Sequence, residues 1–409
     1  MLLKQYLKEH HKHLKPVNPK KSETKVPKDT KCPDCRAPSK YLYFNDGKKR
    51  SQIKCKVCDC LFNLHRRLIR KTKFWCPHCN HALYLWKHRR DCSIYKCDND
   101  QCSVFTNNFK KLNRLEKALR KTKSSQFKLR YQYREYHFTN EQLQHSAPDQ
   151  SNFIFNIRNS MNTLCLALTF HISLGISARK TAFILQNVFQ LQASYQTVLN
   201  YTLYAAPYCH RFNLEFKGHV ESTQAGDETY IKVAGKHAYT FFFITPTRRK
   251  ITSYHIDDSR DTLPATIAMT EAIRTAPDNQ SPTFITDGNP SYPSGIHFLN
   301  ESRNDNNKIS HKQVIGLQNL DSESTEFRPL KQLIERLNRT YKFHTQAANG
   351  FNNTKGAISL TTLFVTYYNF FRPHASLDYE SPIPRKDLLS IPTLQGKWAQ
   401  VLNTAFSLN

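Results

Sequence analysis

Ten of the twelve cysteines of this 409-residue chain lie between Cys32 and Cys102, and most of them come as close pairs. The first pair forms CPDC, and after nineteen intervening residues the second forms CKVC. Each CxxC turn can place two thiolates on one metal ion, and two such turns complete a tetrahedron. The spacing predicts a four-cysteine zinc ribbon with the ligands Cys32, Cys35, Cys55 and Cys58.

A second set of cysteines follows in CPHC and CDNDQC, and it predicts a second ribbon with a wider last gap. Disulfides and a redox CxxC are the alternatives. A cytoplasmic chain disfavours the first, and the lack of an adjoining βαβ pattern disfavours the second. We interpret the aromatic residues Tyr41, Tyr43, Phe62 and Trp86 as ribbon core rather than base-stacking platforms. The expected ligands are Cys76, Cys79, Cys97 and Cys102, with Cys92, His78, His81 or His88 as possible substitutes and Cys60 unassigned.

The charge of the chain is concentrated in the same region as the cysteines. The formal net charge is +28, of which residues 1–150 carry +22 and residues 151–409 carry +6. Such asymmetry indicates a nucleic-acid partner, because a cationic surface releases the counterions condensed on phosphates. With 11 Gly and no GxGxxG or GxxxxGK[ST] string, the Rossmann and P-loop nucleotide sites are excluded. No apolar stretch is long enough for a membrane span and no secretory signal is evident, so we expect a cytoplasmic, nucleoid-associated protein.

Two helical segments after residue 150 predict a helix-turn-helix. GISARKTAFILQ offers Ser177 as a helix N-cap, and ASYQTVLNYT offers Ser194 as the next. A short helix, a connection and a second helix with exposed polar residues is the layout of that DNA-binding motif. The residues expected to contact DNA are Arg179, Lys180, Ser194, Tyr195, Gln196 and Asn200.

The pattern changes after Gly218 from helical to alternating. Three strand-like runs, ETYIKVAG, HAYTFFFITP and KITSYHID, precede a helix from Asp261, a fourth strand PTFITD and a helix near Pro329. This order predicts an α/β, ribonuclease H-like catalytic core. The expected organisation is a basic flexible tail (1–31), tandem zinc ribbons (32–105), a basic linker with one helix (106–150), a small all-α helix-turn-helix domain (151–210), the catalytic domain (218–384) and a C-terminal tail (385–409).

Two carboxylates of this core are candidate ligands for hard cations. Asp227 opens the first predicted strand and Asp287 ends the fourth, and these ends should lie side by side. Glu335, on the polar side of the later amphipathic helix, is expected to be the third. Three carboxylates can hold the two Mg²⁺ (or Mn²⁺) ions of an in-line phosphoryl transfer.

Other acidic residues compete for these roles. Glu228 adjoins Asp227, and because successive strand residues face opposite ways we expect it to face solvent. Glu323 and Glu326 are rivals to Glu335, which we prefer because it lies well inside the amphipathic helix.

The residues around these carboxylates resemble DDE-type transposases of prokaryotic insertion sequences (the integrase/recombinase superfamily). The matching strings are GDETYIKVAGKHAY, FITDGNPSYP, IERLNRTYKFHTQAANGF and, from Tyr368, YNFFRPHASLDYESPIP. The resemblance implies that Asp227, Asp287 and Glu335 bind the metals, and that Arg339 and Lys342 contact DNA near the active site. This chain differs from the shortest transposases of that family in two features: the tandem cysteine modules and the longer interval between Asp287 and Glu335.

The function implied is a DNA transposase that cleaves and joins DNA by metal-dependent phosphoryl transfer. Its partners would be double-stranded DNA, both the terminal inverted repeats of the element and the target, and further copies of the chain in a homodimer or higher oligomer. Its metals would be two Mg²⁺ ions per active site and two structural Zn²⁺ ions. The alternative is a zinc-ribbon and helix-turn-helix DNA-binding regulator with a degenerate nuclease-like domain.

Overall fold

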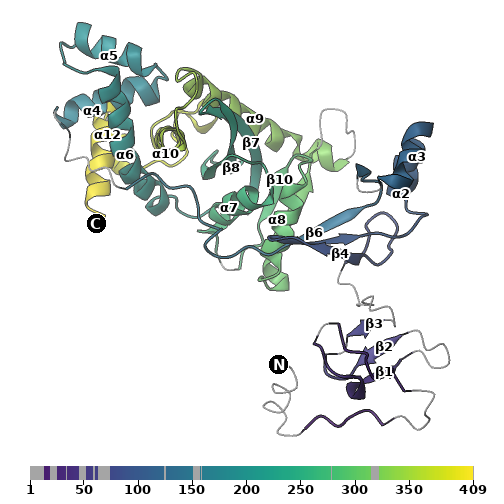
Figure 1. Ribbon diagram of the computed structural model, residues 1–409. Coiled ribbons are helices and arrows are strands. Elements are labelled where there is room, and N and C mark those ends of the chain that lie inside the picture. Colours follow the sequence, from purple (N-terminus) through teal and green to yellow (C-terminus); the bar gives the residue numbers. More distant parts are fainter. Residues whose placement is uncertain are drawn as a thin grey trace. The chain divides into compact units, whose positions relative to one another are not determined.

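The computed structural model describes two compact units, residues 1–135 and 136–409, and each is taken by itself (Figure 1). No helix among the described residues is long and apolar enough to span a membrane. Much of the predicted tail, residues 1–12 and 19–24, lies outside the description. The described residues are 13–18, 25–33, 35–45, 52–58, 60–62, 74–123, 126–150, 157, 159–277, 279–314 and 322–408.

The first cysteine module is a three-stranded antiparallel sheet in the order β1-β2-β3. Its small core contains the fully buried side chains of Ile53 and Phe62, which confirms the sequence interpretation of Phe62 as core. With so few apolar residues, half of the remaining buried core residues are cysteines. The elements are η2 (Ser39–Tyr41), β1 (Leu42–Phe44), β2 (Ile53–Cys55) and β3 (Leu61–Phe62).

The second cysteine module contains a sheet in the order β4-β5-β6 and two helices. β6 falls within the predicted linker, so that part of the linker expectation is corrected: residues 132–136 complete a sheet. Asn113 and Glu116 form a capping box at the start of α3, inside the stretch predicted to be helical. The elements are β4 (Tyr84–His88), β5 (Cys92–Lys96), α2 (Ser103–Lys110), α3 (Arg114–Thr122) and β6 (Gln132–Tyr136).

Trp86 corrects another expectation, because its side chain is 40% exposed instead of forming ribbon core. It lies on β4 where the pairing with β5 shifts register between Leu85 and Lys87. Such a bulge re-aims the side chain. The ammonium groups of Lys87 and Lys96 lie 4.1 and 4.7 Å from the indole ring.

A helical layer opens the second unit, and Ser177 and Ser194 are confirmed as N-caps. Their hydroxyls accept hydrogen bonds from the backbone N–H groups of Lys180 and Thr197. The layer shares its core with helices from the end of the chain. Its elements are α4 (Met161–Leu168), the π-helical turn η6 (Thr169–Ser173), α5 (Ala178–Asn187), α6 (Tyr195–Glu215), α10 (Thr354–Phe370), α11 (Lys386–Leu389) and α12 (Leu394–Phe406).

The expectation of a C-terminal tail over residues 385–409 is therefore corrected. The α12 residue Trp398 is fully buried, and its indole N–H donates a 3.0 Å hydrogen bond to the Ser173 hydroxyl. A large aromatic side chain with its polar atom satisfied anchors α12 to the helical layer.

The region predicted to be the catalytic domain contains a five-stranded mixed sheet in the order β11-β10-β7-β8-β9. β7, β8 and β9 are antiparallel, whereas β10 runs parallel to β7 and β11 parallel to β10. Helices α7 and α8 pack on one face, and α9 and α10 pack on the other (Figure 1). The elements are β7 (Thr223–Val233), β8 (Lys236–Ile244), β9 (Ile251–Asp257), α7 (Thr262–Ile273), β10 (Thr283–Thr286), α8 (Ser291–Asn300), η7 (Asp305–Asn307), β11 (Ser310–Gln313), α9 (Ser322–Gln346) and η8 (Ala375–Leu377).

The predicted order of strands and helices is observed, with two shifted boundaries. β7 begins at Thr223, so Asp227 lies inside the strand rather than opening it. α9 begins at Ser322 and contains Pro329. Residues 322–328 include one large apolar side chain, Phe327, so they carry no periodicity from which a helix could be predicted.

Candidate active site and cysteine clusters

Asp227 and Asp287 meet where β10 ends beside β7. The pairing of β10 with β7 runs as far as Ile285 opposite Ala225, and Asp287 follows one residue after the end of β10. Beyond that point β7 continues with β8 as its neighbour. The two aspartates therefore lie side by side at the point where the pairing of β10 with β7 stops. Their proximity is what the sequence predicted.

The backbone at this edge depends on Gly226. A Cβ atom at position 226 would collide with the ring of Phe243, its cross-strand partner on β8. The absence of a side chain at Gly226 lets the large buried Phe243 pack directly under the strand that carries Asp227. Here the glycine is required for close approach rather than for an unusual backbone angle.

A third carboxylate, Glu228, joins the two aspartates. One carboxylate oxygen from each of Asp227, Glu228 and Asp287 lies within 4.8 Å of the others. The expectation that Glu228 faces solvent is wrong: its side chain is 6% exposed. Strand alternation does send it to the opposite face from Asp227, but α8 and the loop before it cover that face. The Tyr292 hydroxyl and the Asn289 amide donate hydrogen bonds of 2.8 and 3.0 Å to it.

Helix α9 approaches the cluster from the other face of the sheet. The Lys331 ammonium lies 3.2 Å from Asp227 Oδ1, and the Asn338 amide donates a 3.1 Å hydrogen bond to Asp227 Oδ2. Burial raises the pKa of Asp227 to about 6; Lys331 opposes this effect, whereas Asp287 and Glu228 reinforce it. Among the described residues, the cations beside these three close carboxylates are Lys331 and, 3.9 Å from Glu228 Oε1, the exposed guanidinium of Arg260. A divalent cation would relieve the remaining repulsion between the carboxylates.

The third predicted carboxylate, Glu335, is not part of the cluster of three. It is exposed, on the same side of α9 as Lys331 and Asn338, because positions i, i+4 and i+7 share one helix face. Its rival Glu326 is also exposed, near the start of α9. The side chain of Glu323 lies outside the described part of the chain.

The carboxylate cluster fits a hard cation by its donor set. The side chains are oxygen donors close enough to share one ion, with no sulfur or imidazole among them. The Asn338 carbonyl oxygen is also buried, with no hydrogen-bond partner among the described residues. Sequence reasoning missed the supporting roles of Asn289 and Tyr292, although both follow Asp287 closely in DGNPSYP.

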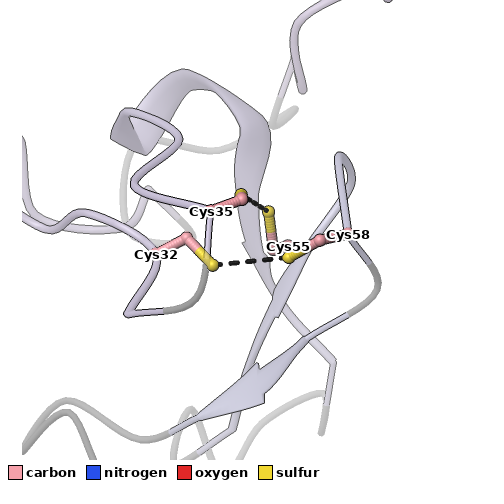
Figure 2. A group of neighbouring side chains, drawn as sticks. All are labelled: Cys32, Cys35, Cys55 and Cys58. Atoms are coloured by element: carbon pink, nitrogen blue, oxygen red, sulfur yellow. Dashed lines mark hydrogen bonds between the residues drawn. The ribbon is translucent and has the colours of Figure 1, made fainter. Parts of the chain in front are cut away.

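The two cysteine clusters contain the predicted sets of residues and none of the proposed substitutes. In each set one Sγ atom from every cysteine lies within 4.8 Å of the other three. Figure 2 shows the first set, Cys32, Cys35, Cys55 and Cys58, converging from two turns. The second set is Cys76, Cys79, Cys97 and Cys102.

The sulfur spacing within the clusters matches a tetrahedral metal site. The Sγ–Sγ distances are 3.5 Å for Cys32–Cys58 and 3.6 Å for Cys35–Cys55. A tetrahedron with Zn–S bonds of about 2.3 Å has edges of about 3.8 Å, whereas a disulfide needs about 2.05 Å. Burial raises the pKa of Cys55 to about 12 and also raises the pKa of Cys58, so these two thiols would stay protonated without a cation. The residues therefore fit a Zn²⁺ ion.

The residues predicted to contact DNA lie at two places in the second unit. Arg179, Lys180, Ser194, Tyr195 and Gln196 are exposed at the starts of α5 and α6, and Asn200 is half-buried. Three of them line a cavity of about 870 Å³ with the β7–β8 turn and residues 347–353. On α9, Arg339 is exposed, and the Lys342 ammonium lies 4.4 Å from the ring of Tyr230.

This mixed α/β fold brings two aspartates together where two parallel strands end, with a polar helix face beside them. Residues 222–358 match a family model described as a DDE domain. The resemblance to DDE-type transposases is thereby confirmed for this part of the chain, which contains Asp227, Asp287 and Glu335.

Solved structures with similarity to the chain include viral integrases and a transposase. The chain is 13% identical to the HTLV-2 integrase catalytic core domain in complex with magnesium, over 39% of this chain and 92% of that one, with a TM-score of 0.25. It is 16% identical to a chain of a simian T-cell lymphotropic virus intasome, over 53% of this chain and 72% of that one, with a TM-score of 0.29. It is 11% identical to a chain of the Mos1 Strand Transfer Complex, over 63% of this chain and 88% of that one, with a TM-score of 0.18. No curated protein matched the chain.

Proposed function

We propose that this chain is a DNA transposase that binds the terminal inverted repeats of an insertion sequence and catalyses strand cleavage and strand transfer on a ribonuclease H-like core. The observation that carries the proposal is the meeting of Asp227 and Asp287 at one sheet edge, within the region that matches a DDE domain. A DNA-binding regulator has no need to collect buried carboxylates at such an edge.

In this proposal Asp227 and Asp287 hold the catalytic Mg²⁺ ions, and Glu335 completes the ligand set from α9. The bound cations would activate the attacking oxygen and stabilise the leaving oxygen of an in-line displacement. Asn338 orients the Asp227 carboxylate, and Lys331 neutralises it. Asn289 and Tyr292 hold Glu228 in place, so the charge of the site is fixed before DNA binds.

The cysteine modules and the helices α5 and α6 would supply DNA binding. Two structural Zn²⁺ ions would cross-link the modules, which bury too little apolar surface to be stable alone. Residues 1–150 carry most of the net charge, and Trp86 with Lys87 and Lys96 offers an aromatic ring flanked by cations. Two element ends must be held at once, so we propose a dimer or larger assembly.

The test is a cleavage assay with the full chain, Mg²⁺ and a DNA duplex that carries the end of the element flanking the gene. We expect a new 3′-hydroxyl at the repeat boundary and joined products when target DNA is added. Asp227→Asn should abolish both, while Asp258→Asn, which removes an exposed carboxylate from the turn after β9, should leave both intact. Specific binding without cleavage by the wild type would reject the proposal in favour of a regulator.

A further inference from the structure

Two of the three tryptophans of the chain lie in the second cysteine module, and both are exposed there. The side chains of Trp75 and Trp86 are 61% and 40% exposed, whereas Trp398 is fully buried in the second unit. Tyr84, which lies between the two exposed tryptophans in the sequence, is 41% exposed. Large aromatic rings left in water forgo the stabilisation that burial would give, so a group of them on one small module indicates a contact surface.

The sheet of the second module places these three rings on one face. Successive residues of a strand point to opposite faces. Tyr84 and Trp86 take the exposed face of β4, whereas Leu83, which is 2% exposed, points into the core of the module. Trp75 forms an antiparallel bridge with Ala82, two residues before Tyr84, and cross-strand partners share a face. We call Trp75, Tyr84 and Trp86 the aromatic strip.

Two lysines lie against the aromatic strip. Lys96 on β5 is the cross-strand partner of Tyr84, so it shares the face of that ring. Its ammonium reaches to 4.7 Å from the ring centroid of Trp86, which shows that the bulge in β4 keeps the indole on this face. The Lys87 ammonium lies 4.1 Å from the same centroid. Within the described part of the chain, neither ammonium is paired with a carboxylate.

The charge around the aromatic strip is strongly positive. Residues 74–135 contain 14 Lys and Arg against 5 Asp and Glu, which gives this module a net charge of +9. Arg89 and Arg90 are exposed in the turn directly after β4. A surface of this charge attracts a polyanion, because binding releases the counterions that the polyanion has condensed.

The exposed rings indicate which kind of polyanion fits. In a DNA duplex the faces of the bases are covered by neighbouring bases, so a duplex offers phosphates to the lysines but no base face to the rings. In an unpaired strand the base faces are free, and aromatic side chains stack on them while cations follow the backbone. The first cysteine module lacks such a surface among its described residues, because Tyr41, Tyr43, Phe44 and Phe62 are buried or half-buried.

We propose that the aromatic strip binds single-stranded DNA, with unpaired bases stacked on its rings and the backbone held by the surrounding lysines and arginines. This inference rests on the proposed function, which makes DNA the nucleic acid concerned. Strand cleavage and joining leave DNA ends whose bases can separate from the complementary strand. The second cysteine module would hold such an unpaired strand, whereas the proposed function otherwise assigns only duplex DNA to the chain.

Tryptophan fluorescence of the full chain tests the inference, because stacking on a base quenches the emission of an exposed indole. Trp398 is buried in the other unit and supplies a constant background. The chain is titrated with a short oligothymidylate and with a base-free oligomer of the same length and charge, in which every nucleotide is an abasic site. A DNA duplex and an oligouridylate of the same length form two further arms.

We expect the oligothymidylate to quench the emission and to bind about tenfold or more tightly than the base-free oligomer, because every stacked base contributes. The duplex should leave the emission unchanged. Trp86→Leu should weaken oligothymidylate binding by about fivefold or more without affecting the base-free oligomer, and Trp86→Phe should retain the binding because a ring remains. The matched control is Leu115→Ala, which removes an apolar side chain that is 77% exposed on α3 of the same module. Equal zinc content and circular dichroism would show that the variants remain folded.

Three results would overturn the inference: equal affinity for the oligothymidylate and the base-free oligomer, quenching by the duplex as strong as by the single strand, or oligothymidylate binding that Trp86→Leu leaves intact. Tighter binding of the oligouridylate would reject DNA in favour of RNA. The cleavage assay fails or succeeds independently. Cleavage without quenching would keep the transposase activity and reject the single-strand site, whereas quenching without cleavage would do the reverse.

Discussion

The Lys331 ammonium lies 3.2 Å from Asp227 Oδ1, within ion-pair distance of this carboxylate. Lys331 thus partly neutralises a carboxylate that is buried beside Asp287 and Glu228. We infer that a divalent cation bound by Asp227 competes with the Lys331 ammonium, which links metal affinity to the ionisation of this cluster.

The first prediction concerns pH. The carboxyl pKa of Asp227 is raised to about 6, so the group gains a proton as the pH falls through 6 and ceases to be a metal ligand. Mn²⁺ affinity, measured by electron paramagnetic resonance on the full chain, should fall about tenfold per pH unit below 6. Lys331→Gln should move this transition to higher pH, because the ammonium favours the ionised form. An affinity that is constant between pH 5 and 7 would contradict the assignment.

The second prediction decides which glutamate acts with the two aspartates. Glu335→Gln should reduce cleavage by about 10³-fold or more, the magnitude expected when a metal ligand of a phosphoryl-transfer site is lost. Glu228→Gln should cost less than about tenfold, because both of its oxygens already accept hydrogen bonds from Asn289 and Tyr292. Glu326→Gln is the matched control on α9 and should be silent. The measurement is the rate of 3′-hydroxyl formation.

If Glu228→Gln proves as damaging as Glu335→Gln while the protein keeps its melting temperature, Glu228 is a metal ligand. The cluster of three carboxylates would then be the complete site.

The sequence predicted the paired aspartates and both cysteine sets, because those signals are local: a carboxylate at a strand end, or two thiols in one turn. It did not predict the burial of Glu228, because strand alternation tells which face a residue takes but not what covers that face. The burial of Trp398 could not be predicted either. A short C-terminal helix has the same sequence pattern whether it is a free tail or packs against distant helices, as α12 does. Arg249 and Arg372 line one cavity although about 120 positions separate them, and no local pattern reveals such a combination.

The third prediction concerns the acid stability of the second unit. Three histidines cluster in its interior, with the ring centroids of His145 and His255 5.7 Å apart and those of His145 and His210 6.0 Å apart. Burial, reinforced by the charge of His145, lowers the pKa of His255 to about 3 and that of His210 to about 4. The unfolded chain therefore binds more protons than the folded one below pH 6.5.

Because the unfolded chain takes up these protons first, the free energy of unfolding is highest above pH 6.5. It decreases as the pH falls toward 4. For His255 alone the loss by pH 4 is about 3 kcal/mol in the free energy of unfolding. Urea unfolding followed by circular dichroism at several pH values would measure it. His255→Gln should flatten the pH dependence, and His219→Gln, at an exposed site, should not. A pH dependence unchanged by His255→Gln would show that the cluster is not its source.

The fourth prediction is the zinc content of the first unit. The full chain should contain two zinc ions, measured by mass spectrometry of the metal, and Cys58→Ser or Cys97→Ser should each reduce the content to one. Cys60 and Cys92 provide matched controls, because both are buried thiols in the same modules but belong to neither cluster. Serine at either position should leave two ions bound.

Structural zinc contributes roughly 10–16 kcal/mol to the folding of small modules, so chelation should unfold the region and weaken DNA binding. Loss of zinc from Cys60→Ser would instead mean that the first cluster uses a different fourth ligand.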